Sequence, residues 1–239
     1  MSNTELDNRL LACASLVRQG SVAADIGSDH AYLPIYLVRH KISPHAIASD
    51  INEGPVNRAK MNVRLSQLSD KIDVILADGL DKAASYNPDD IIIAGMGGEL
   101  IRDILNASEY VKNKEVRLIL QPMTMPHILR EYLAGNGFNI TDEKICAAQD
   151  KYYQIICAEY DGVKRSFTEH ELLLGKINIE RLKNGLADNE SIELVRRMSK
   201  SAKHRADGIS RAAYPDSNAI KKELELIAFC DDLLKNIKE

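Results

Sequence analysis

The feature that most constrains the fold is the alternation of short apolar runs with helical patterns along the first 160 residues. The runs cover residues 22–26, 46–49, 72–76, 91–94 and 118–120. They are nearly continuous in Val, Ile, Ala and Leu, which is typical of strands that helices cover on both faces. Between them, apolar residues recur three and four apart, as in residues 55–68 and 98–105. The pattern predicts an α/β fold with a mostly parallel sheet.

The later part of the chain has a different pattern. Residues 138–148 and 152–160 flank a short polar turn and predict an antiparallel pair at one sheet edge. Beyond Gly162, residues 169–186, 191–206 and 219–237 show helical spacing without proline. Two long antiparallel helices with an intervening helix would bury their apolar stripes. We predict one domain over residues 1–163 and a helical, coiled-coil-like appendage over residues 164–239.

Composition excludes several classes of protein. An apolar fraction of 45% with 28% charged residues is ordinary for a soluble chain. No apolar run approaches the roughly 20 residues of a membrane span, and the first residues lack a signal-peptide core, so a cytoplasmic protein is expected. Cysteine and histidine spacings suggest no metal site, and no obligate protein partner is evident. Four scattered cysteines are expected as buried free thiols: Cys13, Cys146, Cys157 and Cys230.

Charge is unevenly distributed along the chain. The formal net charge is −4, which argues against a generally basic nucleic-acid binder. Residues 195–206 nevertheless contain five Lys and Arg residues and no acid. Arg196, Lys200 and Lys203 are spaced four and three apart and share one helix face. Two explanations remain open for this face: a ridge that follows RNA phosphates, or an ordinary solvated surface.

Each of the first four predicted strands ends in a carboxylate or a glycine turn. In a parallel α/β sheet, ligands bind outside these carboxyl ends. Asp50 at the second strand end is suited to two ribose hydroxyls, and Asp78 at the third could accept from an adenine amino group. Gly27 would allow close approach of the backbone, whereas Asp29 would repel a pyrophosphate. The strand ends therefore predict an adenosine pocket that suits S-adenosylmethionine better than a dinucleotide.

The motifs at these strand ends carry a family resemblance. They are ADIGSDHAYLP at residues 24–34, AGMGG at 94–98 and LQP at 120–122. The chain resembles the bacterial tRNA (adenine-22-N1)-methyltransferases, with one departure at Met123, where that family often carries Asn. The resemblance implies a Rossmann-like methyltransferase domain that transfers a methyl group from S-adenosylmethionine to N1 of adenine 22 in tRNA.

The resemblance also implies roles for individual residues. Those implied to border the cofactor are Arg9, Gly27, His30, Asp50, Asp78, Gly95 and Met96, while Asp29 belongs to the reaction site. We expect Asp25, Ser28, Ile51 and Gly79 at the cofactor as well. The expected substrate contacts are Gly97, Gln121, Pro122, Arg196, Lys200 and Lys203.

Adenine N1 carries a free lone pair, so its methylation requires alignment rather than a base. We expect Asp29 to accept from the adenine amino group and to stabilise the developing positive charge. Structural explanations stay open for three features: Asp29 or Asp50 as a helix cap, and residues 95–98 as a tight turn. Two other functions also stay open, namely a small-molecule methyltransferase and a non-catalytic S-adenosylmethionine-binding regulator with a helical partner-binding tail.

Overall fold

The computed structural model describes residues 6–235. It divides into two compact units, Met1–Ser166 and Phe167–Glu239. The predicted boundary at residue 163 lies three residues before this division.

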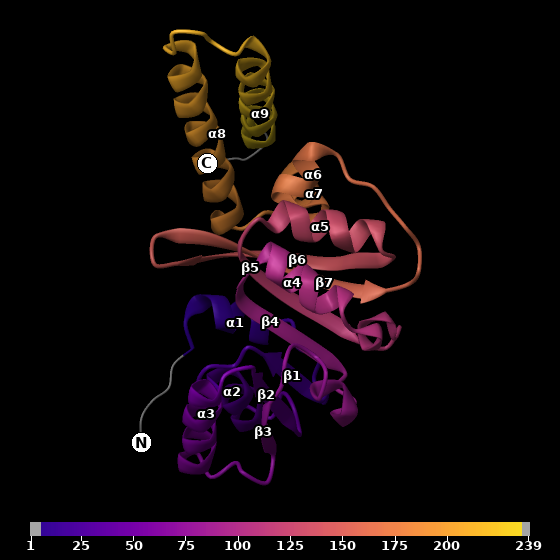
Figure 1. Ribbon diagram of the computed structural model, residues 1–239. Coiled ribbons are helices and arrows are strands. Elements are labelled where there is room, and N and C mark those ends of the chain that lie inside the picture. Colours follow the sequence, from indigo (N-terminus) through magenta and orange to yellow (C-terminus); the bar gives the residue numbers. More distant parts are fainter. Residues whose placement is uncertain (1–5, 236–239) are drawn as a thin grey trace. The chain divides into compact units, whose positions relative to one another are not determined.

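A seven-stranded sheet in the order β3-β2-β1-β4-β5-β7-β6 forms the centre of the first unit (Figure 1). The strands are β1 (Ala23–Ile26), β2 (Ala46–Asp50), β3 (Ile72–Leu76), β4 (Asp90–Gly97), β5 (Arg117–Thr124), β6 (Phe138–Ala148) and β7 (Lys151–Tyr160). The first five pair in parallel, and β7 is antiparallel to both β5 and β6. The predicted parallel sheet with an antiparallel edge pair is confirmed.

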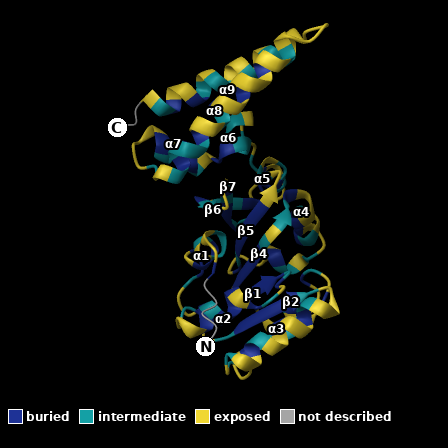
Figure 2. Ribbon diagram, turned by 90° about the vertical axis from the view of Figure 1, so that its left-hand side faces the viewer, coloured by how far each residue is buried: buried dark blue, intermediate teal, exposed yellow. Residues whose placement is uncertain are grey.

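Helices cover both faces of this sheet. They are α1 (Asn8–Ala14), α2 (Tyr32–Arg39), α3 (Glu53–Leu65), α4 (Gly98–Asn106) and α5 (Pro126–Gly135), with short 3-10 turns η1 (Ala83–Tyr86) and η2 (Glu109–Lys112). Side chains alternate between the faces along β4, because Ile91 and Ile93 pack with α4 and α5, whereas Ile92 packs with α1 and α2. Four of the parallel strands, β1, β2, β4 and β5, are largely buried (Figure 2), which explains their nearly continuous apolar sequences, whereas the edge strand β3 buries only Ile72.

The segments that follow β4 and β5 meet backbone to backbone. A Cβ atom on Gly98, the first residue of α4, would lie 2.3 Å from the carbonyl oxygen of Met125. Backbone atoms cannot swing aside as a side-chain end can, so only glycine fits there. The expected turn over residues 95–98 is instead the irregular end of β4, where Met96 and Gly97 still pair with β5, followed directly by the first residue of α4.

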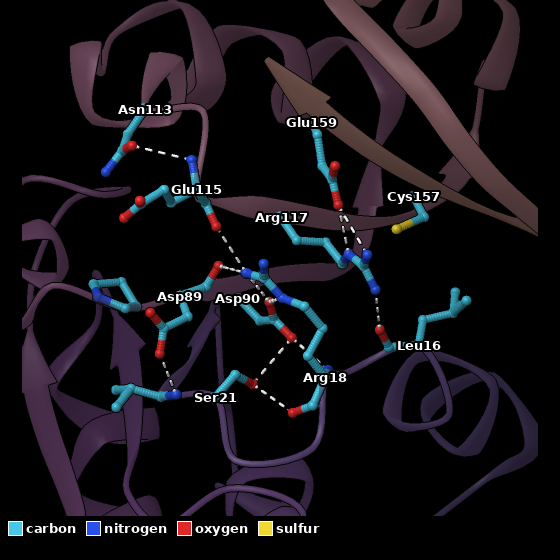
Figure 3. Close-up of polar contacts among 12 residues, drawn as sticks. Leu16, Arg18, Ser21, Asp89, Asp90, Asn113, Glu115, Arg117, Cys157 and Glu159 are labelled. Atoms are coloured by element: carbon cyan, nitrogen blue, oxygen red, sulfur yellow. Dashed lines mark hydrogen bonds and ion pairs between the residues drawn. The ribbon is translucent and has the colours of Figure 1, made fainter. Parts of the chain in front are cut away.

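The amino ends of β4 and β5 carry a closed polar network (Figure 3). Asp90 is fully buried and accepts from the Arg18 backbone N–H at 2.6 Å, from Arg18 Nε at 2.7 Å and from Ser21 Oγ at 3.1 Å. Arg18 also donates to the Glu115 carbonyl, and Arg117 pairs with Glu159 at 2.9 Å. This network joins the segment after α1 to the sheet.

The second unit consists of helices. They are α6 (Glu169–Leu174), α7 (Lys176–Lys183), α8 (Asn189–Ser210) and α9 (Ser217–Lys235). The single helix expected over residues 169–186 is wrong, because Gly175 adopts φ +95°, which ends α6 and turns the chain into α7. Thr168 and Glu171 form a capping box at the start of α6. The long antiparallel pair is α8 with α9, and not residues 169–186 with α9.

Small residues allow α8 and α9 to pack closely. The buried face of α8 includes Val195, Ser199 and Ala202, and α9 contributes Cys230 and Leu233. Cross-helix polar contacts border this seam, since Ser199 Oγ donates to Asp231 at 2.9 Å. The expected coiled-coil-like appendage is present as this helical pair (Figure 1). The last two residues of the expected helix over 219–237 lie outside the described range.

All four cysteines are buried free thiols, as predicted. None of the helices within residues 6–235 is long and apolar enough to cross a membrane. The same residues contain no group of three or more His, Cys, Asp or Glu side chains placed to hold a metal ion.

Candidate active site

A cavity of about 400 Å³ opens where the strand order reverses between β1 and β4. This is the position at which open α/β sheets bind ligands. Its walls come from the segment around α1, from the loop after β1 and from the end of β4. Seven predicted site residues line it: Arg9, Asp25, Gly27, Ser28, Asp29, His30 and Gly95.

The loop after β1 is held close to β2 and β4. The backbone N–H groups of Gly27 and Ser28 both donate to the Ser49 carbonyl, at 2.7 and 2.8 Å. Gly27 has φ +81°, and a Cβ atom there would lie 2.1 Å from the terminal methyl of Met96. The positive φ therefore favours glycine at position 27, whereas the contact with the flexible end of Met96 could be relieved by movement of that side chain.

Asp25 is a buried carboxylate without a cationic partner. It is 8% exposed, and no lysine or arginine within residues 6–235 forms an ion pair with it. Burial raises the pKa of Asp25 from 3.8 to about 6, opposed by a hydrogen bond from Ser28 and reinforced by the charge of Asp50. Ionisation of this carboxyl group therefore carries an energetic cost that a cationic ligand would offset.

Arg9 reaches across the cavity wall to the end of β5. Its Nη1 donates to Gln121 Oε1 at 2.7 Å, and that oxygen also accepts from the Gly95 N–H at 3.1 Å. Arg9 is further held by Asp7 at 2.9 Å and lies 5.7 Å from the centre of the Tyr153 ring. These contacts fix the guanidinium at the edge of the cavity.

Gln121 and Pro122 were predicted at the substrate, but the structure places both among the buried residues of β5. The Gln121 amide is engaged at both ends, because its Nε2 donates to the Pro122 carbonyl. Gln121 thus supports Arg9 and Gly95 from behind the wall. Met123, the departure from the family pattern, places its sulfur 3.6 Å from Arg9 Nη1 and 3.7 Å from Gln121 Nε2.

Asp29 lies at the rim of the cavity and contacts the side chains of Arg58 and His30. Arg58 Nε donates to its Oδ1 at 3.1 Å, Arg58 Nη2 contacts the same oxygen, and His30 Nε2 lies 3.2 Å from Oδ2. The His30 ring stacks on Tyr32 with centroids 4.9 Å apart. Asp29 as the cap of α2 is wrong, because Ala31 occupies the N-cap position and no side chain caps this helix.

Sequence reasoning missed Arg58, which lies on the second turn of α3. Helices after the second strand of such a sheet run beside the loop after the first strand, so a cation there was a usable signal. One turn further along, Asn62 Nδ2 donates to the His30 carbonyl at 3.0 Å. Together the two side chains attach the loop to α3.

Asp50 ends β2 and shapes the turn into α3. Its Oδ1 accepts from the Asn52 N–H at 2.8 Å, but Asn52, not Asp50, occupies the N-cap position. Asp50 as a plain helix cap is therefore wrong. The next residue, Ile51, exposes its apolar side chain.

Asp78 and Gly79 line a second cavity of about 320 Å³, which they share with residues of α4 such as Leu100 and Ile104. The predicted single adenosine pocket is therefore divided between two cavities. Asp50, Ile51 and Met96 belong to the lining of neither. Gly97 occupies the N-cap position of α4, with Thr124 Oγ1 3.3 Å from where a Cβ would be.

The basic residues of α8 lie in the second unit. Arg196 is 3.8 Å from Glu193, and Lys203 is 3.7 Å from Asp231 of α9. Lys200 is exposed. These three side chains share a solvent-facing surface of the helix, and both explanations given for them above stay open.

Comparison with known proteins agrees with this geometry. A protein family described as a methyltransferase domain matches residues 6–156. The tRNA (adenine(22)-N(1))-methyltransferase of Bacillus subtilis strain 168 is 34% identical over an alignment 247 positions long. The alignment covers 99% of this chain and 98% of that enzyme.

Solved structures extend the similarity to both units. The crystal structure of the B. subtilis m1A22 tRNA methyltransferase aligns with a TM-score of 0.81 at 30% identity, covering 98% of this chain and all of that one. A Streptococcus pneumoniae protein solved in complex with S-adenosyl-L-methionine aligns with a TM-score of 0.78 at 31% identity, covering 95% and 98%. The fold is that of Rossmann-like methyltransferases, and the chain belongs to the family of bacterial tRNA (adenine(22)-N(1))-methyltransferases.

Proposed function

We propose that this protein transfers a methyl group from S-adenosylmethionine to N1 of the adenine at position 22 of tRNA. The observation that carries the proposal is the match to the B. subtilis enzyme over nearly the full length of both chains. A tRNA substrate would place the reaction in the cytoplasm.

The residues of the first cavity fit this cofactor, as does Asp50, which lies outside the lining of the cavity. Asp25 has no counter-charge among the residues that the structure describes, and an ammonium or sulfonium group would provide one. Arg9 is placed to meet a ligand carboxylate, and Asp50 Oδ2 accepts no hydrogen bond within the described residues and could accept from a ribose hydroxyl. A pyrophosphate in the same cavity would face Asp25 and Asp29, which disfavours a dinucleotide.

Asp78 and Gly79 would take the adenine end of the cofactor from the second cavity. Leu100 and Ile104 supply apolar surface there, and the Asp78 carboxylate can accept from an amino group. Met96 lies against Gly27 and would have to accommodate a ligand that spans both cavities.

When bound, S-adenosylmethionine supplies an electrophilic methyl group on a positively charged sulfur. Because adenine N1 has a free lone pair, the chain needs no general base and mainly orients the target base. Asp29 accepts a hydrogen bond from the adenine amino group and stabilises the positive charge that develops on the base. Gly95 and Gly97 leave room for a flat ring beside the cavity.

The second unit would hold the body of the tRNA through the exposed face of α8. If Arg196, Lys200 and Lys203 contact phosphates, their joint reversal to Glu weakens tRNA binding and flattens its salt dependence. An unchanged salt slope would identify the three as an ordinary solvated surface.

Primer extension tests the proposed reaction directly. The protein is incubated with S-adenosylmethionine and an unmodified tRNA transcript that carries adenine at position 22. Methylation of N1 blocks base pairing, so reverse transcriptase should stop next to position 22, and a transcript with guanine there should give no stop. Calorimetry with S-adenosylmethionine and NAD tests the cofactor separately. Absence of the stop, despite cofactor binding, would favour a small-molecule substrate or a regulatory role.

A further inference from the structure

Arg58 presents a half-exposed guanidinium at the rim of the first cavity. Its side chain is 47% exposed, and its only ion pair within the described residues is with Asp29. Asp29 lines the cavity, whereas Arg58 stands just outside it. The guanidinium is therefore an exposed cation beside the cavity that Asp29 lines.

The pair between Arg58 and Asp29 conflicts with the role proposed for Asp29. A carboxylate stabilises a developing positive charge less well while an arginine already neutralises it. Both side chains are about half exposed, at 47% and 53%. An ion pair between two side chains this exposed is weak, so exchange of its partner costs little.

The backbone that carries Arg58 is fixed, although the side chain is exposed. Val56, Ala59 and Val63 anchor α3 in the core, and Asn62 ties the helix to the His30 carbonyl. A long, flexible side chain on a rigid helix can change partners without moving the loop. A guanidinium also matches the geometry of phosphate oxygens, with two donors to one group.

We propose that Arg58 contacts the tRNA backbone. On binding, its guanidinium exchanges Asp29 for a phosphate that flanks the target nucleotide, which leaves the Asp29 carboxylate free for the adenine amino group. This inference rests on the proposed function, because it requires tRNA as the substrate. It adds a residue that positions the tRNA strand. It also means that the Asp29 carboxylate is released from its ion pair only when the strand is bound.

The salt dependence of tRNA binding tests the contact. Dissociation constants are measured for one tRNA transcript between 50 and 300 mM salt, with wild-type protein, Arg58→Gln, Arg58→Lys and Arg64→Gln. Loss of one phosphate contact should lower the log–log slope by about 0.7–0.9 and weaken binding about tenfold at the lowest salt. Arg58→Lys should keep most of the slope. Arg64→Gln, an exposed arginine on the same helix, should match wild type.

A double-mutant cycle tests the exchange of partners. Asp29→Asn should tighten tRNA binding by up to about fivefold, because it releases Arg58 from a pair worth at most about 1 kcal/mol. The same change in the Arg58→Gln background should have no effect. If the tightening persists there, the carboxylate simply repels tRNA and the exchange is disproved.

The experiments give one result if the proposed function is wrong and a different result if only the Arg58 contact is wrong. A wild-type protein that neither binds nor methylates tRNA would refute the function. A protein that methylates tRNA, with the same salt slope in wild type and Arg58→Gln, would refute only the phosphate contact. Circular dichroism melts of each variant confirm that the protein compared is folded.

Discussion

The two ends of the parallel sheet treat a buried carboxylate in opposite ways. At the amino end, Asp90 accepts hydrogen bonds from Arg18 and Ser21 and is paired with the Arg18 guanidinium (Figure 3). At the carboxyl end, Asp25 on the neighbouring strand has a hydrogen bond from Ser28, and none of residues 6–235 gives it a cationic partner. The buried carboxylate at the amino end is thus paired with a cation of the chain, and the one at the carboxyl end is not paired within the described residues.

This difference separates stabilisation from binding. Partners for Asp90 come from the chain itself, so its charge is compensated whenever the protein is folded. Asp25 reduces stability until a ligand brings a positive group. Functional sites commonly sacrifice local stability in this way.

The largest effect is expected from Arg18→Met. This change leaves Asp90 fully buried without its cation, although the backbone N–H of residue 18 remains a donor. The free energy of unfolding should fall by about 3–5 kcal/mol in urea titrations. Arg64→Met, at an exposed position, should change it by less than about 0.5 kcal/mol. Equal stabilities would mean that the amino-end network contributes little.

The next effect concerns activity rather than stability. Asp29→Asn should lower the single-turnover methylation rate by about 10²-fold, because one preorganised charge contact to the base is lost. Cofactor affinity, measured by calorimetry, should stay within a few-fold of wild type. Full activity would remove Asp29 from the reaction.

Asp25→Asn should raise the free energy of unfolding, whereas Arg18→Met should lower it. Since burial raises the pKa of Asp25 from 3.8 to about 6, the contribution of this group to stability falls as pH increases between about 4 and 6. The Asn variant lacks this loss, so it should be more stable above pH 6, by about 1–3 kcal/mol, and equal below pH 4. Cofactor binding should weaken strongly. A variant less stable at pH 8 would contradict the electrostatic account.

Ser28→Ala should have the smallest effect, a change in the pH dependence of stability that arises from Asp25. The Ser28 hydrogen bond lowers the pKa of Asp25, so its loss should move that pKa further upward. The descending part of the stability profile between pH 4 and 6 should then extend to higher pH. Thermal melts across this range measure the change, and Ser85→Ala in η1 provides a control far along the chain. No displacement of the profile would mean that the hydroxyl leaves Asp25 unaffected.

Much of the fold could be predicted because local sequence patterns encode it. The apolar runs that became β1 to β5 gave the parallel sheet, and the acids and glycines after them indicated the site edge. Gly175 was a missed signal, because a glycine within a helical pattern frequently marks its end. The helix predicted across it was therefore wrong.

Long-range pairs could not be predicted from one sequence. Arg18 and Asp90 are 72 residues apart, and Arg58 and Asp29 are 29 apart, so no local pattern joins them. Gln121 looked like a residue open to ligand because it follows a strand, yet packing turned its amide inward toward Arg9 and Gly95. The type of site was predictable, whereas the pairing within it required coordinates.

The close approach of Gly98 to the Met125 carbonyl has a consequence for engineering. A mutant library intended to reshape the cavity for unnatural methyl donors should keep position 98 constant, because any added atom there meets main chain. Position 96 is the better choice for randomisation, since the group nearest Gly27 is the end of a flexible methionine. Smaller residues at position 96 would open space beside Gly27, while the contact between Gly98 and the Met125 backbone stays unchanged.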